Sequence, residues 1–368
     1  MRILLLGEYS NVHWTLACAL RRLGYDVCVI SDGDTWKRYP TDMLLIRKPG
    51  TWGSIAYLYK VLKLLPKLRG YDVVQFINPI NFIGLKAERC MHVYDYLRRH
   101  NKRVFLGAYG DDYYFVYNSV VRRALRYSDY YTPTREVEHE WNIRQKHEWL
   151  QTSKKKVSIH VAQTCDGIIS ALYEYDVAYR PYFPDKTTFI PLPIEIDEHD
   201  TIECGKAVGS QGKIRFFIGI QRTRTELKGT DIMLRALKRI VADYPDRAEM
   251  IKAESVPFAQ YKEMLRSSDV LLDQIYSYTP AMNALQAMSM GLVVVSGGEE
   301  ENYEILGEKE LRPIINVQPE EEDVYRQLEQ LILHSERIPQ LKRDSIEYVR
   351  RHHDSIKVAR QYLKAWTT

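Results

Sequence analysis

Cysteine is scarce in this sequence, and its five cysteines, Cys18, Cys28, Cys90, Cys165 and Cys204, include no Cys-x-x-Cys pair. An odd, widely spaced set argues against a disulfide framework and against a zinc site, so no metal centre is expected. Long apolar runs are also missing, since no window approaches the roughly 18 residues that a membrane span needs. No low-complexity or repeated segment is present. These absences leave a globular protein without a membrane anchor as the expected class.

The Gly-x-Gly-x-x-Gly fingerprint of dinucleotide-binding proteins is missing from the first strand-to-helix turn, residues 8–13. No nicotinamide or flavin cofactor is therefore expected. The apolar run of residues 2–7 is too short for a secretory signal, so we expect a cytoplasmic protein, with the inner face of the membrane as an alternative location. The basic residues lack the interleaved aromatic platforms on which single strands stack, which argues against nucleic acid as a partner.

Charge is distributed unevenly along the 368 residues. Residues 1–192 contain 28 Lys+Arg and 19 Asp+Glu, a net charge of +9, and the remaining residues contain 24 and 29, a net charge of −5. A basic half of this kind favours anionic partners such as a membrane leaflet or a phosphorylated substrate.

The stretch from residue 214 to residue 237 is the most informative part of the sequence. It predicts a buried strand over 214–218, then Gly219, then a loop with Arg222, Arg224 and Lys228, and then an amphipathic helix. Ligands of open α/β sheets bind at the carboxyl ends of strands, where a helix amino terminus adds partial positive charge. The arrangement suits a diphosphate, although a solvated basic loop is the alternative reading.

Strand and helix patterns alternate along the rest of the chain, which is typical of parallel, doubly wound sheets. The fold class expected is α/β, with two tandem Rossmann-like domains. We assign residues 1–195 to a first domain, 196–212 to a linker and 213–354 to a second domain, followed by a final helix over 355–368. One helix is expected over 136–154, and another, with Pro280 in its first turn, over 280–290.

Residues 54–69 predict a helix with Ile55, Leu58, Val61, Leu62 and Leu65 on one face and lysines toward another. Such a helix can lie in a membrane interface. The more frequent alternative is that the apolar stripe packs on a sheet and the lysines are solvated.

A set of ordered motifs carries a family resemblance. The motifs are Asp-Gly-Ile-Ile-Ser at 166–170, Phe-Ile-Pro-Leu-Pro-Ile-Glu-Ile-Asp at 189–197, Gly219 to Lys228-Gly229, Gln-Ala-Met-Ser-Met-Gly-Leu-Val-Val-Val at 286–295, and Gly297-Gly298 followed by Glu304-Ile305. With them the chain resembles the retaining GT-B glycosyltransferases of group 1 type over nearly its whole length. The resemblance implies a nucleotide-sugar donor, a glycan or lipid-linked acceptor, no metal or other cofactor, and front-face attack with retention. It also implies that residues 1–195 form the acceptor-binding domain, that residues 213–354 form the nucleotide-sugar-binding domain, and that the helix 355–368 returns to the first domain.

The sequence departs from the family at two places. Members of the family carry two glutamates eight positions apart, which contact the transferring sugar and the ribose, and here these places hold Tyr278 and Gln286. Glutamine still donates to and accepts from a hydroxyl. Two alternatives therefore stay open beside a glycosyltransferase, namely a non-catalytic sugar-nucleotide or glycan-binding protein and a nucleotide-sugar epimerase of the same fold.

Candidate site residues follow from the resemblance together with the chemistry of a departing diphosphate. Catalytic roles are assigned to Arg224, Lys228, His13 and Asp111. Donor contacts are assigned to Gly219, Arg222, Tyr278, Met282, Asn283, Gln286, Gly298 and Glu304. Acceptor contacts are assigned to Asn11, Asn78, Asn81 and Tyr109.

Several of these residues have structural alternatives. His13 is a base, a hydroxyl ligand or a structural group at a helix start. Asp111 and Asp112 either contact acceptor hydroxyls or cap the next helix. Asp32-Gly-Asp34 matches the metal-binding Asp-x-Asp of another glycosyltransferase class, but a polar turn at a strand end is the more frequent meaning of so short a motif. The basic first half favours an acceptor in cell-surface polysaccharide synthesis, with peripheral membrane contact through residues 54–69.

Overall fold

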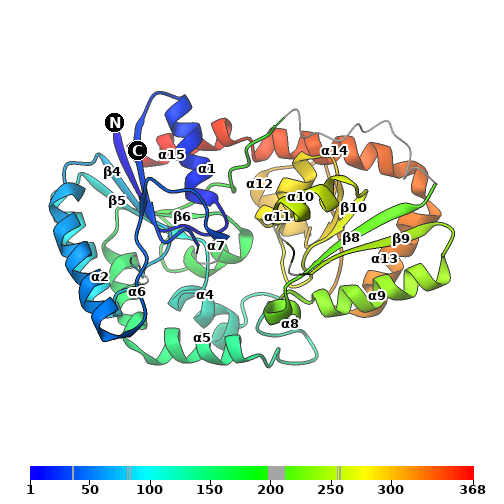
Figure 1. The fold of residues 1–368 in the computed structure, drawn as a ribbon, viewed down its shortest axis with the longest axis horizontal. Helices are drawn as coiled ribbons and strands as arrows, with labels where there is room; N and C mark the ends of the chain where they lie inside the picture. Colours follow the sequence, from blue (N-terminus) through cyan, green and yellow to red (C-terminus); the bar gives the residue numbers. More distant parts are fainter. Residues whose placement is uncertain (35–36, 81, 83, 198–211, 255, 257) are drawn as a thin grey trace. The chain divides into compact units, whose positions relative to one another are not determined.

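The structure is a computed structural model that describes residues 1–34, 37–80, 82, 84–197, 212–254, 256 and 258–368 (Figure 1). The chain divides into two compact units. The first contains Met1–Ala124, Glu140–Pro193 and Ser355–Thr368, and the second contains Leu125–His139 and Ile194–Asp354. Most of the expected linker, residues 198–211, lies outside the described residues. None of the helices in the described parts of the chain combines the length and apolar character needed to cross a membrane.

The first unit is built on a seven-stranded sheet in the order β3-β2-β1-β4-β5-β6-β7. All neighbouring strands pair in parallel. The strands are β1 (Arg2–Leu6), β2 (Asp26–Ser31), β3 (Met43–Leu44), β4 (Val73–Phe76), β5 (Arg103–Ala108), β6 (Gly167–Ser170) and β7 (Thr187–Phe189). The strand order reverses between β1 and β4, as in a doubly wound sheet. β1 is buried along four of its five residues, because its apolar run is covered on both faces.

The helices of the first unit are α1 (Val12–Arg22), α2 (Gly50–Leu64), η2 (Leu65–Leu68), α3 (Ala87–His100), α4 (Tyr113–Tyr117), η3 (Asn118–Arg122), α5 (Glu140–Gln151), α6 (Ser153–Thr164), α7 (Tyr173–Tyr179) and α15 (Ser355–Thr367). The prediction of one helix over 136–154 is wrong, because α5 ends at Gln151 and α6 begins at Ser153. The break lies at Thr152, whose extended backbone lets its hydroxyl accept the Lys154 N–H at 3.2 Å.

The second unit has a five-stranded parallel sheet in the order β12-β11-β10-β8-β9. Its strands are β8 (Ile214–Ile220), β9 (Ala248–Glu254), β10 (Val270–Leu272), β11 (Val293–Ser296) and β12 (Ile315–Asn316). Its helices are η5 (Arg222–Arg224), α8 (Thr225–Lys228), α9 (Thr230–Asp243), α10 (Phe258–Arg266), α11 (Met282–Ser289), α12 (Glu300–Leu306), α13 (Glu321–Leu333), η6 (Ser335–Arg337) and α14 (Ile338–His352). Two parallel, doubly wound sheets are therefore confirmed.

Two details of the second unit differ from the sequence prediction. The edge strand β9 was not predicted, because only its first and sixth residues are buried and its sequence contains three charged side chains. The expected first-turn role of Pro280 is wrong, since α11 begins at Met282 with Ala281 as its N-cap.

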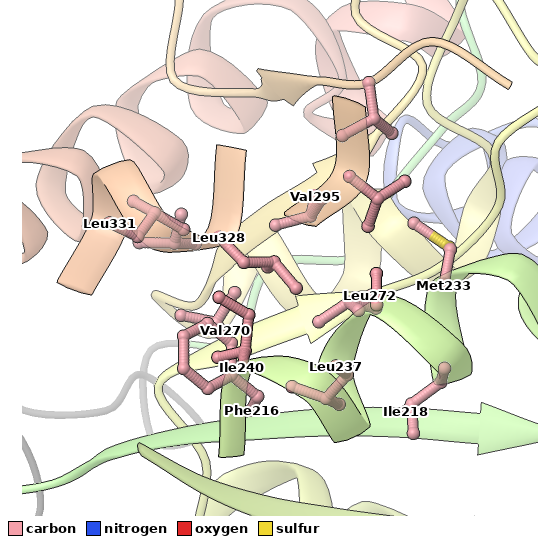
Figure 2. Packing of buried hydrophobic residues seen from close by; sticks show 14 of the residues in the cluster. Phe216, Ile218, Met233, Leu237, Ile240, Val270, Leu272, Val295, Leu328 and Leu331 are labelled. Carbon is pink, nitrogen blue, oxygen red and sulfur yellow. The ribbon is translucent and has the colours of Figure 1, made fainter. Parts of the chain in front are cut away.

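The core of the second unit joins β8, α9 and α13. Figure 2 shows Phe216 and Ile218 of β8 packed with Leu237 of α9, and Leu328 of α13 lies in the same cluster. Val137 belongs to this cluster although it lies in the first half of the sequence. Residues 125–139, assigned to the first domain on sequence, thus pack in the second unit.

Helix α2 differs from the expectation of a single apolar face. Its buried residues are Tyr57, Val61 and Leu64. Ile55 and Leu62, which were expected on the packed face, are 53% and 54% exposed. The helix consequently has apolar side chains on two sides, of which only one packs in the unit.

Candidate functional site

The carboxyl ends of β8 and β10 form the switch point of the second sheet. From β8 the chain continues to β9 on one side, while β10, on the other side, leads on to β11 and β12. The loops after β8 and β10 therefore diverge, and in open α/β sheets ligands bind in a crevice outside such a point. Gly219 lies in β8 at this edge, and a side chain there would meet the Tyr261 ring at 3.1 Å.

Lys228 and Asn283 are brought together at this edge by a carboxylate that sequence reasoning did not single out. Asp273, directly after β10, has a side chain only 2% exposed, and its Oδ1 lies 3.9 Å from Lys228 Nζ. The same Oδ1 accepts from Asn283 Nδ2 at 2.8 Å. Asn283 Oδ1 in turn accepts from the Tyr261 hydroxyl at 3.0 Å. These four side chains, the switch-point cluster, hold a lysine beside a buried negative charge.

The geometry of the cluster would allow Lys228 to bind another anion in place of Asp273. At 3.9 Å, Lys228 is too far from Asp273 for a direct hydrogen bond, and its side chain is 32% exposed. Among the described residues, Asp273 Oδ2 is buried without a hydrogen-bond partner. Gly229 has a φ of +65°, and a Cβ there would lie 1.9 Å from Ile275 Cγ2, so the backbone approaches the loop after β10 closely. The lysine is therefore placed by backbone packing and remains open to an anion.

The two arginines of the basic loop differ in their settings. Arg222 is exposed, and its Nε donates to Glu254 at the end of β9. Hydrogen bonds from Lys252 and Arg222 lower the pKa of the Glu254 carboxyl to about 2. Arg224 is the N-cap residue of α8 and is partly buried. Their roles in donor binding stay predictions.

Tyr278 is enclosed by the segment 125–139. It is 1% exposed, and its hydroxyl accepts the Arg126 N–H at 2.6 Å and the Tyr127 N–H at 3.3 Å. The Tyr127 ring stacks on it with centroids 4.8 Å apart. Burial raises the pKa of the Tyr278 hydroxyl to about 12, so it is neutral. In this arrangement the hydroxyl accepts hydrogen bonds from two backbone N–H groups, and its contact with the donor stays a prediction.

Glu299, after β11, is the buried carboxylate of this region. It accepts from Arg126 Nη2 at 2.7 Å, from the Tyr127 hydroxyl at 2.7 Å, from Gln318 Nε2 at 2.7 Å and from Asn316 Nδ2 at 3.0 Å. Burial alone would raise its pKa, but these donors outweigh burial and hold the pKa below its ordinary value.

The other donor candidates are spread over three elements. Met282 begins α11, and Gln286 on the same helix donates to the Ser289 hydroxyl at 3.1 Å. The Gly298 N–H donates to Asn316 Oδ1 at 2.9 Å. Glu304 is exposed on α12. The structure thus links Lys228 with Asn283 directly, while the roles of these four residues stay predictions.

In the first unit, His13 lies at the switch point between β1 and β4. It is fully buried, with Nδ1 2.8 Å from the Gly7 carbonyl and Nε2 3.3 Å from Gln75 Nε2. Burial lowers the pKa of its imidazole to about 4, so the ring is neutral and both nitrogens are engaged. Glu8 accepts the N–H groups of His13 and Trp14, and burial raises its pKa to about 8. This geometry favours the structural alternative for His13, and its catalytic role stays a prediction.

Tyr109 belongs to a buried network with the carboxyl-terminal helix. Its hydroxyl pairs with the Tyr362 hydroxyl and lies 3.4 Å from Gln75 Nε2. Gln75 Oε1 accepts from Trp366 Nε1 at 3.1 Å. Burial raises the Tyr109 pKa well above its ordinary value. The Tyr109 hydroxyl thus forms a hydrogen bond with α15, and the acceptor contact assigned to Tyr109 stays a prediction.

The loop after β5 is tied to the loop after β4. Asn78 donates through Nδ2 to the Asp111 carbonyl at 3.0 Å. The Asp111 side chain accepts from Trp141 Nε1 at 3.1 Å, whereas Asp112 caps α4 through the Phe115 N–H at 2.9 Å. The cap expected of Asp111 or Asp112 is therefore supplied by Asp112, whose pKa is raised to about 7 by burial.

Asn11 and the Asp32–Asp34 turn follow β1 and β2. Asn11, at the start of α1, has a φ of 71° and donates to the Thr15 hydroxyl at 3.2 Å. Asn81 lies outside the described residues. Asp32 Oδ1 accepts the Asp34 N–H at 3.1 Å and Asp34 pairs with Lys37 at 2.6 Å, as in a polar turn. Within the described residues, no group of three or more metal-ligating side chains is found.

Sequence reasoning missed several residues that organise the second unit. Asp273 had a signal, because it is a carboxylate directly after a buried strand beside the key strand. Tyr261, Glu299 and Arg126 had none, since each is placed by a partner far away in the sequence. Arg126 and Glu299, for example, are 173 positions apart.

Comparisons with known proteins show the fold. No family model and no curated protein matches the sequence. Among solved structures, sucrose-phosphate synthase from Thermosynechococcus elongatus matches with a TM-score of 0.65 and 12% identity, covering 100% of this chain and 98% of that one. Anabaena HepE in complex with UDP and glucose matches with a TM-score of 0.59 and 12% identity, covering all of both chains.

A third similar structure is the catalytic domain of starch synthase IV from Arabidopsis thaliana bound to ADP and acarbose. Its TM-score is 0.63 at 10% identity, covering 100% of this chain and 99% of that one. Identities this low establish architecture but no activity. The chain therefore has the fold of the GT-B glycosyltransferases.

Proposed function

We propose that this protein is a glycosyltransferase that moves a sugar from a nucleoside-diphosphate sugar to a glycan or lipid-linked acceptor, with retention and without a metal ion. The observation that carries the proposal is the position of Lys228. Its side chain is partly exposed and lies at the switch point of a parallel sheet in the GT-B fold. Among the similar structures, HepE is in complex with UDP and glucose, and starch synthase IV is bound to ADP and acarbose. A nucleoside diphosphate matches both the cation and the crevice.

The chemistry asked of Lys228 is to stabilise charge on the leaving group. Cleavage of the sugar–phosphate bond leaves negative charge on the diphosphate, and a fixed cation lowers the free energy of that charge most when it is already in place. The backbone around Gly229 supplies this placement. Arg224 and Arg222, on the neighbouring turn, are the further cations of the proposal. The acceptor is assigned to the loops of the first unit that carry Asn78 and Asp111.

Substitutions of Lys228 and Asp273 are expected to change nucleoside-diphosphate affinity in opposite directions, which tests the proposal. Lys228→Ala removes the cation and is expected to weaken nucleoside-diphosphate binding by about 100-fold or more. Asp273→Asn keeps the shape but removes a nearby negative charge, so binding of the same anion is expected to tighten by about threefold or more. Asp269, buried at the other end of β10 and paired with Lys342 at 2.7 Å, provides the control variant Asp269→Asn.

Isothermal calorimetry of the full chain with UDP, GDP and ADP, with and without magnesium, measures these effects. The expected result is metal-independent binding of one nucleotide, weaker in Lys228→Ala, tighter in Asp273→Asn and within about twofold of wild type in Asp269→Asn. Absence of nucleotide binding at millimolar concentration would overturn the proposed function. Equal affinities of the wild type and the Lys228→Ala variant would instead remove only the lysine from it.

A second candidate is a non-catalytic sugar-nucleotide or glycan-binding protein, favoured by one observation. Tyr278 stands where the retaining GT-B glycosyltransferases have a glutamate. It is buried, and its hydroxyl accepts hydrogen bonds from backbone N–H groups. A product assay with the bound nucleotide sugar separates the candidates, because transfer releases the nucleotide and glycosylates an acceptor. An epimerase would change the sugar without any acceptor, and a binding protein would leave the donor intact. Cell-surface polysaccharide synthesis is the pathway class that we propose for the transferase.

A further inference from the structure

Helix α2 presents an apolar stripe to solvent. Trp52 is 84% exposed, Ile55 53%, Tyr59 65% and Leu62 54%. With 3.6 residues per turn, these four positions fall within a sector of about 80° on the helix. The buried Tyr57, Val61 and Leu64 lie on the opposite side, where they anchor α2 in the first unit. Four large apolar side chains in one sector are a contiguous patch rather than isolated exposed residues.

The charge around this stripe has one sign. The 29 residues from Met43 to Tyr71 contain six cations and no aspartate or glutamate. The cations are Arg47, Lys48, Lys60, Lys63, Lys67 and Arg69, and all six are exposed. Lys63 lies beside the stripe and Lys60 lies between the stripe and the buried face, since successive residues turn by about 100°. Within residues 43–71, the exposed apolar stripe is therefore accompanied by positive charge alone.

Two more exposed apolar side chains precede α2 in the sequence. Leu44, at the end of the edge strand β3, and Ile46 are each 56% exposed. Figure 1 shows α2 at the periphery of the first unit. The exposed apolar stripe of α2, together with Lys60 and Lys63 beside it, is called the α2 surface.

We propose that the α2 surface binds an anionic lipid membrane, with α2 lying in the plane of the interface. Tryptophan and tyrosine prefer the headgroup level of a bilayer, and Ile55 and Leu62 would enter the acyl boundary beneath it. The lysines would meet anionic headgroups, each contributing about 1 kcal/mol of attraction near the surface. A protein partner with an apolar groove would have to supply acidic residues around it, whereas an anionic leaflet supplies both features at once. This inference is independent of the proposed donor site.

Flotation of the full chain with vesicles tests the proposal. Vesicles of phosphatidylcholine with about one third phosphatidylglycerol are compared with vesicles of phosphatidylcholine alone, since the lysines require anionic headgroups. The variant Trp52→Ser/Ile55→Ser/Leu62→Ser removes apolar side chains that are already exposed, so its melting temperature is expected to stay close to that of wild type. Val121→Ser/Ile143→Ser is the matched control, because these residues of the same unit are 55% and 63% exposed but lie outside α2.

The expected result is binding to the anionic vesicles that falls about 10-fold or more in the α2 variant and stays within about twofold in the control. Replacing one lysine, as in Lys63→Gln, is expected to weaken binding about fivefold, and added salt should weaken it further. Wild-type protein that does not float with anionic vesicles, or floats equally after the α2 substitutions, would overturn the proposal. A dimer in solution that the same substitutions dissociate would assign the surface to a second copy instead.

Discussion

Replacing Tyr278 by phenylalanine tests how the segment 125–139 is held in the second unit. The substitution keeps the ring and its stacking on Tyr127 but removes the hydroxyl that accepts two backbone N–H groups. A buried donor left without an acceptor costs about 1–3 kcal/mol. The hydrogen bond from the Arg126 N–H, at 2.6 Å, is the stronger of the two, and the one from the Tyr127 N–H, at 3.3 Å, is the weaker. The free energy of unfolding is therefore expected to fall by about 2–4 kcal/mol in total.

For a unit of this size, each kcal/mol lowers the melting temperature by about 2–4 °C, so a fall of about 4–16 °C is expected. Calorimetric melting measures the fall, and hydrogen exchange should show faster exchange at the amides of Arg126 and Tyr127. The control is Tyr325→Phe, whose hydroxyl donates to the solvent-exposed Asp243 and should cost less than about 1 kcal/mol.

The same variant tests the donor role of Tyr278. Because the hydroxyl is turned toward backbone, nucleoside-diphosphate affinity should stay within about twofold of wild type, since no contact with the ligand is lost. A melting temperature unchanged within about 1 °C, combined with lost nucleotide binding, would refute the structural reasoning. It would place the hydroxyl in the donor site instead.

Two further substitutions test the switch points by stability. The folded-state pKa of Glu8, about 8, lies above its ordinary value of 4.5, so its contribution is fully present below pH 4.5 and is lost as pH rises through 8. Melting curves of Glu8→Gln should therefore depend less on pH between 5 and 8 than those of wild type, and parallel curves would contradict the burial of an acid there. Gly229→Ala, which combines a positive φ with a 1.9 Å approach to Ile275, should lose about 3 kcal/mol or more in the free energy of unfolding. Gly307→Ala, with a φ of +68° and open space around its Cβ position, should lose only about 1 kcal/mol, and equal losses in chemical denaturation would show that the contact with Ile275 is unimportant.

The sequence by itself determined the architecture and the key loop. Continuous apolar runs such as β1 and β8 can be satisfied only by burial on both faces, so their alternation with helices predicts two parallel sheets. Gly219 and the cations that follow it predicted a strand, a turn and a helix in this order. The structure has the strand β8 and the helix α9, but β8 extends to Ile220, and η5 and α8 occupy the segment predicted as a loop. These features depend on local patterns, which one stretch of sequence contains completely.

Local patterns also explain the misplaced elements. β9 has the polar sequence of an edge strand, and no periodicity separates such a strand from a loop. The break between α5 and α6 depends on one cap, Thr152, inside a continuous helical pattern. The sequence contains the apolar residues of both sides of α2. Which side is buried, however, depends on neighbours from other parts of the chain.

Only the tertiary structure decided which polar side chains meet. Asp273 and Lys228 are 45 positions apart, and Tyr278 and Arg126 are 152 apart, so their pairing follows from strand order and from the place of segment 125–139. Burial then decides the state of each group, since His13 becomes a neutral, hydrogen-bonded ring while the Lys228 side chain stays 32% exposed. Hydrogen bonding and desolvation act between atoms in contact, and those contacts exist only once distant segments have packed together.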